Sequence, residues 1–163
     1  MRKLKLSEWA QLAEIVGAFA VVLSLLYVGY QIQLSTAESR NDSIQAITAR
    51  DEQIALTYVS SETVGIAFFK VIRGEELSQR ENGVMANMLF AHLRVLEDTY
   101  NKYRQGYLEE SFMDSRKRLV ILIILSSPQV RESYEAQKRA GIYPSPFIDW
   151  FDDELRNSDE ADE

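Results

Sequence analysis

An uncharged run of 23 residues near the N-terminus constrains this chain more than any other feature. Between Ile15 and Ala37 there is no Asp, Glu, Lys or Arg, and most residues are apolar. A helix needs about 20 apolar residues to cross the hydrocarbon core of a bilayer. Trp9 before the run, and tyrosines in its second half, suit the aromatic belts of membrane interfaces. The run therefore predicts a transmembrane helix over residues 9–34, preceded by a basic flank over residues 1–8.

Two other interpretations of this run remain open. The basic start and the small residues Ser35 and Ala37 also fit a cleavable signal peptide that is cut after Ala37. The apolar region, however, is longer than the core of about 7–15 residues that such signals have. A buried core helix of this length would be unusual in a chain of 163 residues. We favour an uncleaved anchor, whose first partner is the lipid bilayer.

Small residues follow one face of the predicted membrane helix at steps of four, three and four. They are Ala13, Gly17, Ala20 and Ser24. Small side chains let two membrane helices approach closely. The same residue types are also common in membrane helices without any partner. As a helix-packing stripe, the four residues predict a homo-oligomer or packing against a larger membrane protein.

The rest of the chain has the pattern of an all-α domain. We expect the membrane helix to continue to about Val59, and residues 35–156 to form a helical soluble domain. Ser78 and Glu81 have the spacing of a capping box, which starts the longest helix of this domain. Residues 157–163 include four acids, and we expect them to form a disordered tail. The five predicted helices of the domain cover residues 62–73, 78–105, 109–125, 129–139 and 147–156.

Composition excludes many kinds of active site. The chain has no Cys and one His, which removes disulfide frameworks, zinc fingers, iron–sulfur clusters and sites that need two imidazoles. No Gly-rich phosphate loop, nucleophile elbow or clustered metal-ligand motif is present in the sequence. The net charge of -7 argues against nucleic-acid binding. We therefore expect no enzyme activity, no catalytic residue, no metal and no cofactor.

Two groups on the longest predicted helix are candidates for binding. Glu97, Tyr100 and Arg104 lie three and four residues apart, so they share one helix face. They would form either a polar latch against neighbouring helices or a polar pocket for a small ligand. His92 lies on the apolar face of the same helix. A lone His there is most often a hydrogen-bonded core group, and we see no partner in the sequence for a catalytic base.

Charge is unevenly distributed along the chain. Arg116, Lys117 and Arg118 form the one strong basic cluster, which is either a solvated helix face or a contact for anionic lipid headgroups. From Ser35 onward there are 15 Lys and Arg against 23 Asp and Glu. Anionic lipid would repel such a domain overall, and a basic protein partner would suit it better.

Several motifs resemble those of a known group of proteins. From Ala13 the chain reads Ala-Glu-Ile-Val-Gly-Ala, and this segment ends in Gln-Ile at Ile32. Glu97 to Gly106 read Glu-x-x-Tyr-x-x-Tyr-Arg-x-Gly, and two Ser-Pro pairs follow. In these motifs the chain resembles a large group of uncharacterised bacterial single-pass membrane proteins. The resemblance implies one anchor plus a helical domain, and it implies no activity.

Charges beside the membrane helix bear on its orientation. Three basic residues lie within residues 1–8, whereas Arg40 and Arg50 are the basic residues that follow the helix within about 20 positions. The positive-inside rule then places the N-terminus in the cytoplasm and the domain outside. The resembling group carries Arg and Asn where this chain has Gln33 and Ser35, which would favour a cytoplasmic domain. We expect a single-pass protein of the bacterial inner membrane with its N-terminus in the cytoplasm.

Two functions from different classes fit these features. The first is a membrane-anchored helical module for interaction or assembly, which the small-residue stripe and the absence of catalytic motifs favour. The second is a membrane-tethered sensor that binds a small ligand in a polar pocket around Glu97.

Overall fold

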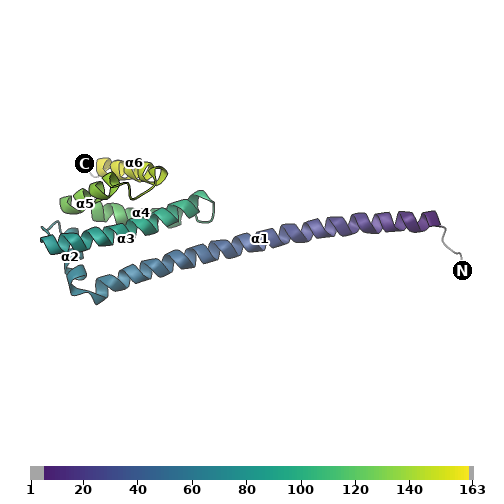
Figure 1. The fold of residues 1–163 in the computed structure, drawn as a ribbon, viewed down its shortest axis with the longest axis horizontal. Coiled ribbons are helices and arrows are strands. Elements are labelled where there is room, and N and C mark those ends of the chain that lie inside the picture. The colour runs from purple at the N-terminus through teal and green to yellow at the C-terminus, as the bar shows by residue number, and fades with distance from the viewer. Residues whose placement is uncertain (1–5, 162–163) are drawn as a thin grey trace. The chain divides into compact units, whose positions relative to one another are not determined.

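The computed structural model describes residues 6–161, and six helices account for most of them (Figure 1). No strand occurs within this range. The all-α class, the long first helix and the five helices after it are confirmed. The helices are α1 (Leu6–Ser60), α2 (Glu62–Ile72), α3 (Gln79–Arg104), α4 (Glu110–Leu125), α5 (Pro128–Arg139) and α6 (Ser145–Ala161).

The chain divides into two units, and α1 contributes to both. The first unit ends at Asn41, and the second runs from Asp42 to the C-terminus. In the first unit, the apolar part of α1 is exposed, and by length and composition it is able to cross a membrane. The second unit begins just before Ile47, which is fully buried. The basic residues within 1–5 lie outside the described residues, as do the side chains of positions 6–8.

The core of the second unit surrounds α3, which packs against α2, α4 and α5. Met85, Leu89, Leu93 and Leu96 recur along one face of α3 and are almost completely buried. This spacing of four, four and three residues is that of one helix stripe. Tyr103, which the sequence pattern places on the same face, is 37% exposed instead. It lies in the last turn of α3.

The seven-residue apolar run over 119–125 contributes to the core. Val120, Ile123 and Ile124 are buried, whereas Leu119 and Leu122 face outward. On α6, Phe147 and Phe151 are buried, and Trp150 packs partly against the same core. The Phe147 and Phe151 rings lie 6.0 Å apart between their centroids. Aromatic pairs at such separations stabilise a core beyond the area that they bury.

Local signals in the sequence define most helix ends. The predicted capping box is present: Ser78 Oγ accepts from Glu81 N, and the Glu81 carboxylate accepts from Ser78 N at 2.8 Å. Ser61 caps α2 through Val64 N. Gly residues follow three helices with positive φ, which L-residues adopt at a cost in backbone strain. They are Gly74, Gly106 and Gly141.

Lowering the pH should weaken the capping box. Hydrogen bonds from Lys70 and Ser78 lower the pKa of Glu81 from 4.5 to about 2. The unfolded chain therefore takes up this proton first, so the stabilisation is complete above pH 4.5 and is lost as pH falls from 4.5 toward 2. We expect the difference in unfolding free energy between the native chain and Glu81→Gln to shrink across this range, measured by urea unfolding. The matched control is Glu52→Gln at an exposed position of α1. A Glu81→Gln difference that stays constant with pH would refute the prediction.

The last helix differs from its prediction at both ends. It begins at Ser145, because the Pro144 carbonyl already accepts from the backbone N–H groups of Phe147 and Ile148. It continues to Ala161, so the expected disorder of residues 157–163 is wrong for 157–161, and residues 162–163 lie outside the described range. The acidic end is held by Asp159, whose carboxylate pairs with Arg131 of α5 at 2.6 Å. That contact joins two helices, and local charge content cannot reveal it.

Candidate functional site

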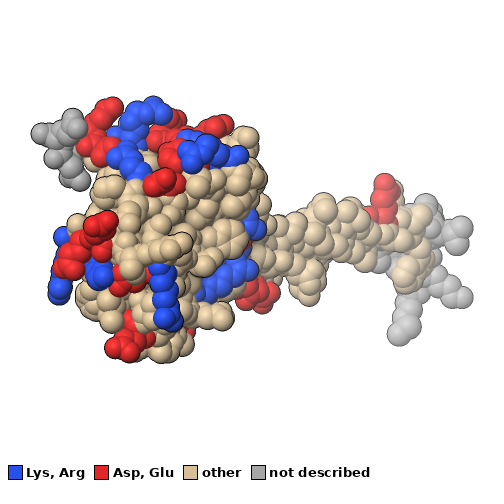
Figure 2. Space-filling model, turned by 60° about the vertical axis from the view of Figure 1, so that its left-hand side comes forward, with Lys and Arg blue, Asp and Glu red and all other residues tan. Residues whose placement is uncertain are grey.

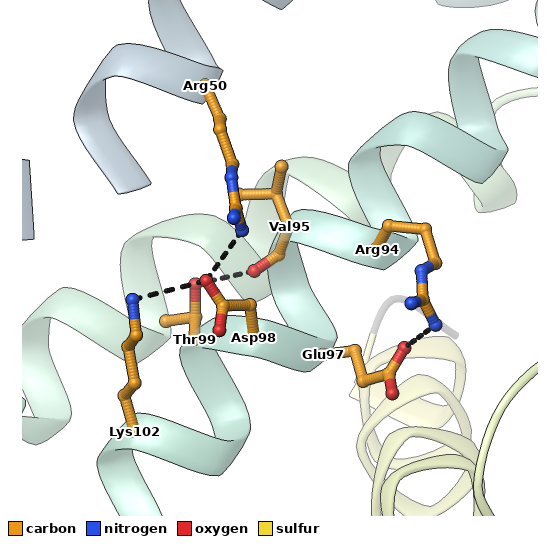
Figure 3. Close-up of polar contacts among 7 residues, drawn as sticks. All are labelled: Arg50, Arg94, Val95, Glu97, Asp98, Thr99 and Lys102. Atoms are coloured by element: carbon orange, nitrogen blue, oxygen red, sulfur yellow. Dashed lines mark hydrogen bonds and ion pairs between the residues drawn. The ribbon is translucent and has the colours of Figure 1, made fainter. Parts of the chain in front are cut away.

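Glu97 forms a local ion pair on α3. Its Oε2 accepts from Arg94 Nη1 at 2.5 Å, and its side chain is only 11% exposed (Figure 3). It borders a polar depression together with Arg50, Asp98 and Asn101. Since a buried carboxylate needs a charged or hydrogen-bonding partner, Arg94 already satisfies Glu97.

Tyr100 connects α3 to α6. Its hydroxyl donates to the Pro146 carbonyl at 2.9 Å, and its ring stacks on Trp150 with centroids 4.8 Å apart. The Arg104 guanidinium lies 5.8 Å from the centroid of the Tyr100 ring, within range of a cation–π contact. The hydroxyl and ring of Tyr100 thus join α3 to α6, whereas the Arg104 contact stays within α3.

The three predicted residues make their contacts in different places. The depression beside Glu97 includes neither Tyr100 nor Arg104. The contacts of Tyr100 favour the predicted latch, and Glu97 belongs to a separate ion pair. The spacing of three and four residues put all three on one side of α3, but it carried no information about which neighbouring helix each side chain meets.

The structure shows a second ionic group on α3 that the sequence pattern did not predict. Asp98 Oδ2 accepts from Arg50 of α1 at 2.7 Å and pairs with Lys102 at 3.2 Å (Figure 3). Beside it, Thr99 Oγ1 donates to the Val95 carbonyl at 2.7 Å. Asp98 and Lys102 have the spacing of a helix pair, but Arg50 lies 48 residues away, so no local pattern predicts it.

A cleft of 360 Å³ lies within the second unit, between α1, α2, α3 and α4. Most of its lining is apolar, and its polar groups are Asp51, Tyr58, His92 and Arg116. The Tyr58 hydroxyl lies 3.0 Å from His92 Nε2. Burial lowers the pKa of His92, opposed by the charge of Asp51, and burial raises the pKa of Tyr58 to about 12. Both side chains are therefore neutral at pH 7, and His92 is a hydrogen-bonded core group as predicted.

The basic cluster is largely taken up by ion pairs. Arg116 pairs with Asp51 at 2.7 Å, and its guanidinium carbon lies 3.6 Å from the centroid of the Phe112 ring. Lys117 pairs with Glu154 at 2.8 Å and with Asp114 on its own helix. Arg118 is exposed. With two of its three cations bound to carboxylates, the cluster is a poor candidate for binding lipid headgroups.

The small-residue stripe lies in the first unit, and its four members are exposed: Ala13, Gly17, Ala20 and Ser24. Apart from its chain neighbours and the surrounding helix backbone, a Cβ atom added at Gly17 would meet no atom within 4 Å. Ser24 Oγ donates to the Ala20 carbonyl at 2.8 Å, which satisfies the hydroxyl within its own helix. Farther along this face, Gln31 Nε2 donates to the Tyr27 hydroxyl at 3.1 Å. The Ser24 hydroxyl and one Gln31 N–H of this face thus have partners within the helix.

In residues 6–161, no three His, Asp or Glu side chains gather where they could hold a metal ion. Comparison of the chain with protein-family models, with curated proteins and with solved structures finds no match. The site residues described above therefore rest on the geometry of this chain alone.

Proposed function

We propose that this chain is a single-pass membrane protein whose helical domain is an interaction module, and that it assembles with a second copy through its membrane helix. The observation that carries the proposal is the uncovered apolar part of α1. Its side chains from residue 13 to residue 38 are all exposed, including Leu25 at 67% and Leu26 at 66%. Figure 2 shows this segment as a surface almost free of charged side chains.

Water is a poor environment for such a surface. Covering apolar surface gains about 25 cal/mol per Å², so an apolar helix with nothing packed against it favours lipid or another chain. The segment is long enough to cross a bilayer, and its backbone hydrogen bonds are satisfied within the helix. A bacterial inner membrane would provide the apolar environment that this segment needs. The resemblance to bacterial membrane proteins supports that location.

The stripe indicates the face that a second copy would use. In lipid, helices associate by close packing, and small residues permit it. Ser24 lies on the stripe, and Val22 lies on the opposite side of the helix. Because the chain has no Cys, a single Ser24→Cys variant can be oxidised in membranes to test for a symmetric disulfide. We expect a crosslinked dimer from Ser24→Cys and little from Val22→Cys. Equal crosslinking at both positions would contradict a specific helix pair.

Enlarging Gly17 should weaken the helix pair. In the Ser24→Cys background, Gly17→Ile fills the space where the second backbone would lie, and we expect association to fall about tenfold, or about 1.4 kcal/mol. Gly29→Ile is the matched control, because Gly29 is also free of neighbours within 4 Å and lies on the other side of the helix. The readout is the crosslinked fraction as the protein is diluted with lipid. A similar loss of crosslinked dimer in both variants would contradict a contact at Gly17. If a second protein also co-purified, docking on a larger membrane protein would be favoured instead.

We propose that the N-terminus lies in the cytoplasm. The support is the larger number of basic residues before the helix than directly after it. Asn157→Cys places a thiol at an exposed position of α6. A membrane-impermeant maleimide should label it in intact cells, since the domain would then face outward. Labelling only after lysis would mean that the helical domain lies in the cytoplasm and the N-terminus outside. It would not contradict the membrane anchor itself.

A further inference from the structure

Residues 42–60 of α1, here called the strap, are held on the other helices by little buried apolar surface. Ile47 is the only buried residue of the strap. It packs with Val95 and Leu108 in a small cluster apart from the main core, which α2, α3, α4, α5 and α6 share. Elements with few buried apolar contacts open at a lower free energy than the core around them. Among the helical segments of the second unit, we therefore expect the strap to open most readily.

Polar contacts hold the strap where its apolar packing is interrupted. Ile54, which is partly buried, borders two depressions, the 360 Å³ cleft and another of 310 Å³. Tight packing of the strap is therefore broken at this position. Within residues 6–161, three contacts between polar side chains join the strap to the other helices: Arg50–Asp98, Asp51–Arg116 and Tyr58–His92.

His92 is the group in these contacts whose ordinary pKa lies nearest to neutral pH. Its residue is 9% exposed, and its ring stacks on Tyr58 with centroids 5.9 Å apart. The other ionisable residues that line the cleft are Asp51 and Tyr58 of the strap and Arg116 of α4, while α2 contributes Phe68. Because Asp51 and Arg116 compensate each other, a proton on His92 would leave one uncompensated positive charge in the cleft.

The direction of the pH effect follows from this burial. Burial lowers the pKa of His92 from its ordinary value of 6.5, and the charge of Asp51 opposes the shift only in part. When the strap leaves, His92 meets water and its pKa returns toward 6.5. Above pH 6.5 His92 is neutral in both states. As the pH falls below 6.5, the released state takes up the proton first, so release of the strap becomes more favourable.

We propose that the strap is a proton-sensitive element, which docks on α3 and α4 while His92 is neutral and is released when His92 takes up a proton. One pH unit below 6.5, the ratio of released to docked chains should rise by up to about tenfold. The proposal concerns the second unit alone. It does not depend on the orientation of the membrane helix or on its self-association.

Alkylation of buried thiols in the full chain, purified in lipid nanodiscs, measures the release. Ile47→Cys places a thiol in the buried contact of the strap, and Val130→Cys places one in the main core, where Val130 is equally buried. Each rate is compared with that of the same chain in urea. We expect Ile47→Cys to react at least about tenfold faster than Val130→Cys, because release of the strap exposes only the first thiol. Equal rates would mean that the domain opens as a whole, and would overturn the proposal.

The role of His92 is tested by adding His92→Gln to the Ile47→Cys chain. Glutamine does not titrate, and it keeps a hydrogen-bonding group for Tyr58. Because the thiolate fraction changes with pH in the same way in both chains, the ratio of their alkylation rates reports the effect of His92. As the pH is lowered from 7.5 to 5.5, we expect the chain with His92 to gain up to about tenfold in rate over the chain with Gln. A ratio that stays constant would overturn the proposal.

The titration of His92 can also be followed without any substitution. His92 is the only His in the chain, so a single imidazole signal in the NMR spectrum of the full chain reports its protonation. We expect a midpoint below pH 6.5 for the folded chain and one near 6.5 in urea. A midpoint at or above 6.5 in the folded chain would mean that protonation does not favour release, and the proposed strap would be wrong.

Discussion

Two arginines in the middle of the apolar segment should release this protein from membranes. Val22 and Leu26 are both exposed on α1, and an Arg at the centre of a membrane helix costs about 2.5–3.5 kcal/mol. The double variant Val22→Arg/Leu26→Arg should therefore lose insertion, and we expect most of it to leave the membrane pellet after an alkaline wash. The native chain should stay in the pellet.

The control places the same charges on the same helix outside the predicted span. Leu56 and Val59 are 66% and 86% exposed in the second unit. Leu56→Arg/Val59→Arg adds equal charge there and should remain with the membrane. If both double variants are released to the same extent, added charge alone explains the release, and the apolar segment is not the anchor.

Truncating Phe151 should have the largest effect on the helical domain. Phe151 is fully buried, with the rings of Tyr134 and Phe147 at 5.6 and 6.0 Å between centroids. Phe→Ala in a core lowers stability by about 3–5 kcal/mol, through lost burial and the cavity that remains. This is a large part of the stability of a typical domain, about 5–15 kcal/mol. We expect Phe151→Ala to unfold at much lower urea concentration, followed by near-UV circular dichroism of the full chain in detergent.

The matched substitution is Phe69→Ala on α2. Phe69 is 62% exposed, so its loss should change the unfolding free energy by about 0.5 kcal/mol or less. If Phe151→Ala lowered the unfolding free energy as little as Phe69→Ala, α6 would not be part of the core as described.

Local chemistry made most of the fold predictable. The Ser78–Glu81 capping box, the Gly residues after three helices and the apolar run over 119–125 each act within one or two turns of helix. Their outcome depends little on what packs around them. The end of α6 was mispredicted, and its contact there is not local, because Asp159 pairs with Arg131 of α5.

The candidate site was less predictable, because its contacts join distant parts of the chain. His92 was expected to be a satisfied core group, but its partner Tyr58 is 34 residues away. Likewise Arg116 stood out as part of a basic cluster, whereas its partner Asp51 belongs to α1. Spacing along one helix identified the face on which these residues lie and could not identify the helix that they meet.

The most direct test of a membrane-spanning α1 is the reactivity of single cysteines in isolated membranes. Ala20→Cys lies within the apolar segment, and Asn157→Cys lies at an exposed position of the helical domain. A maleimide needs water to react with a thiolate, so a thiol within the bilayer core is protected. We predict that, in membranes made permeable to the reagent, position 157 is labelled at once and position 20 only after solubilisation and denaturation. Equal labelling at both positions, or a soluble chain that begins after Ala37, would contradict a membrane-spanning helix.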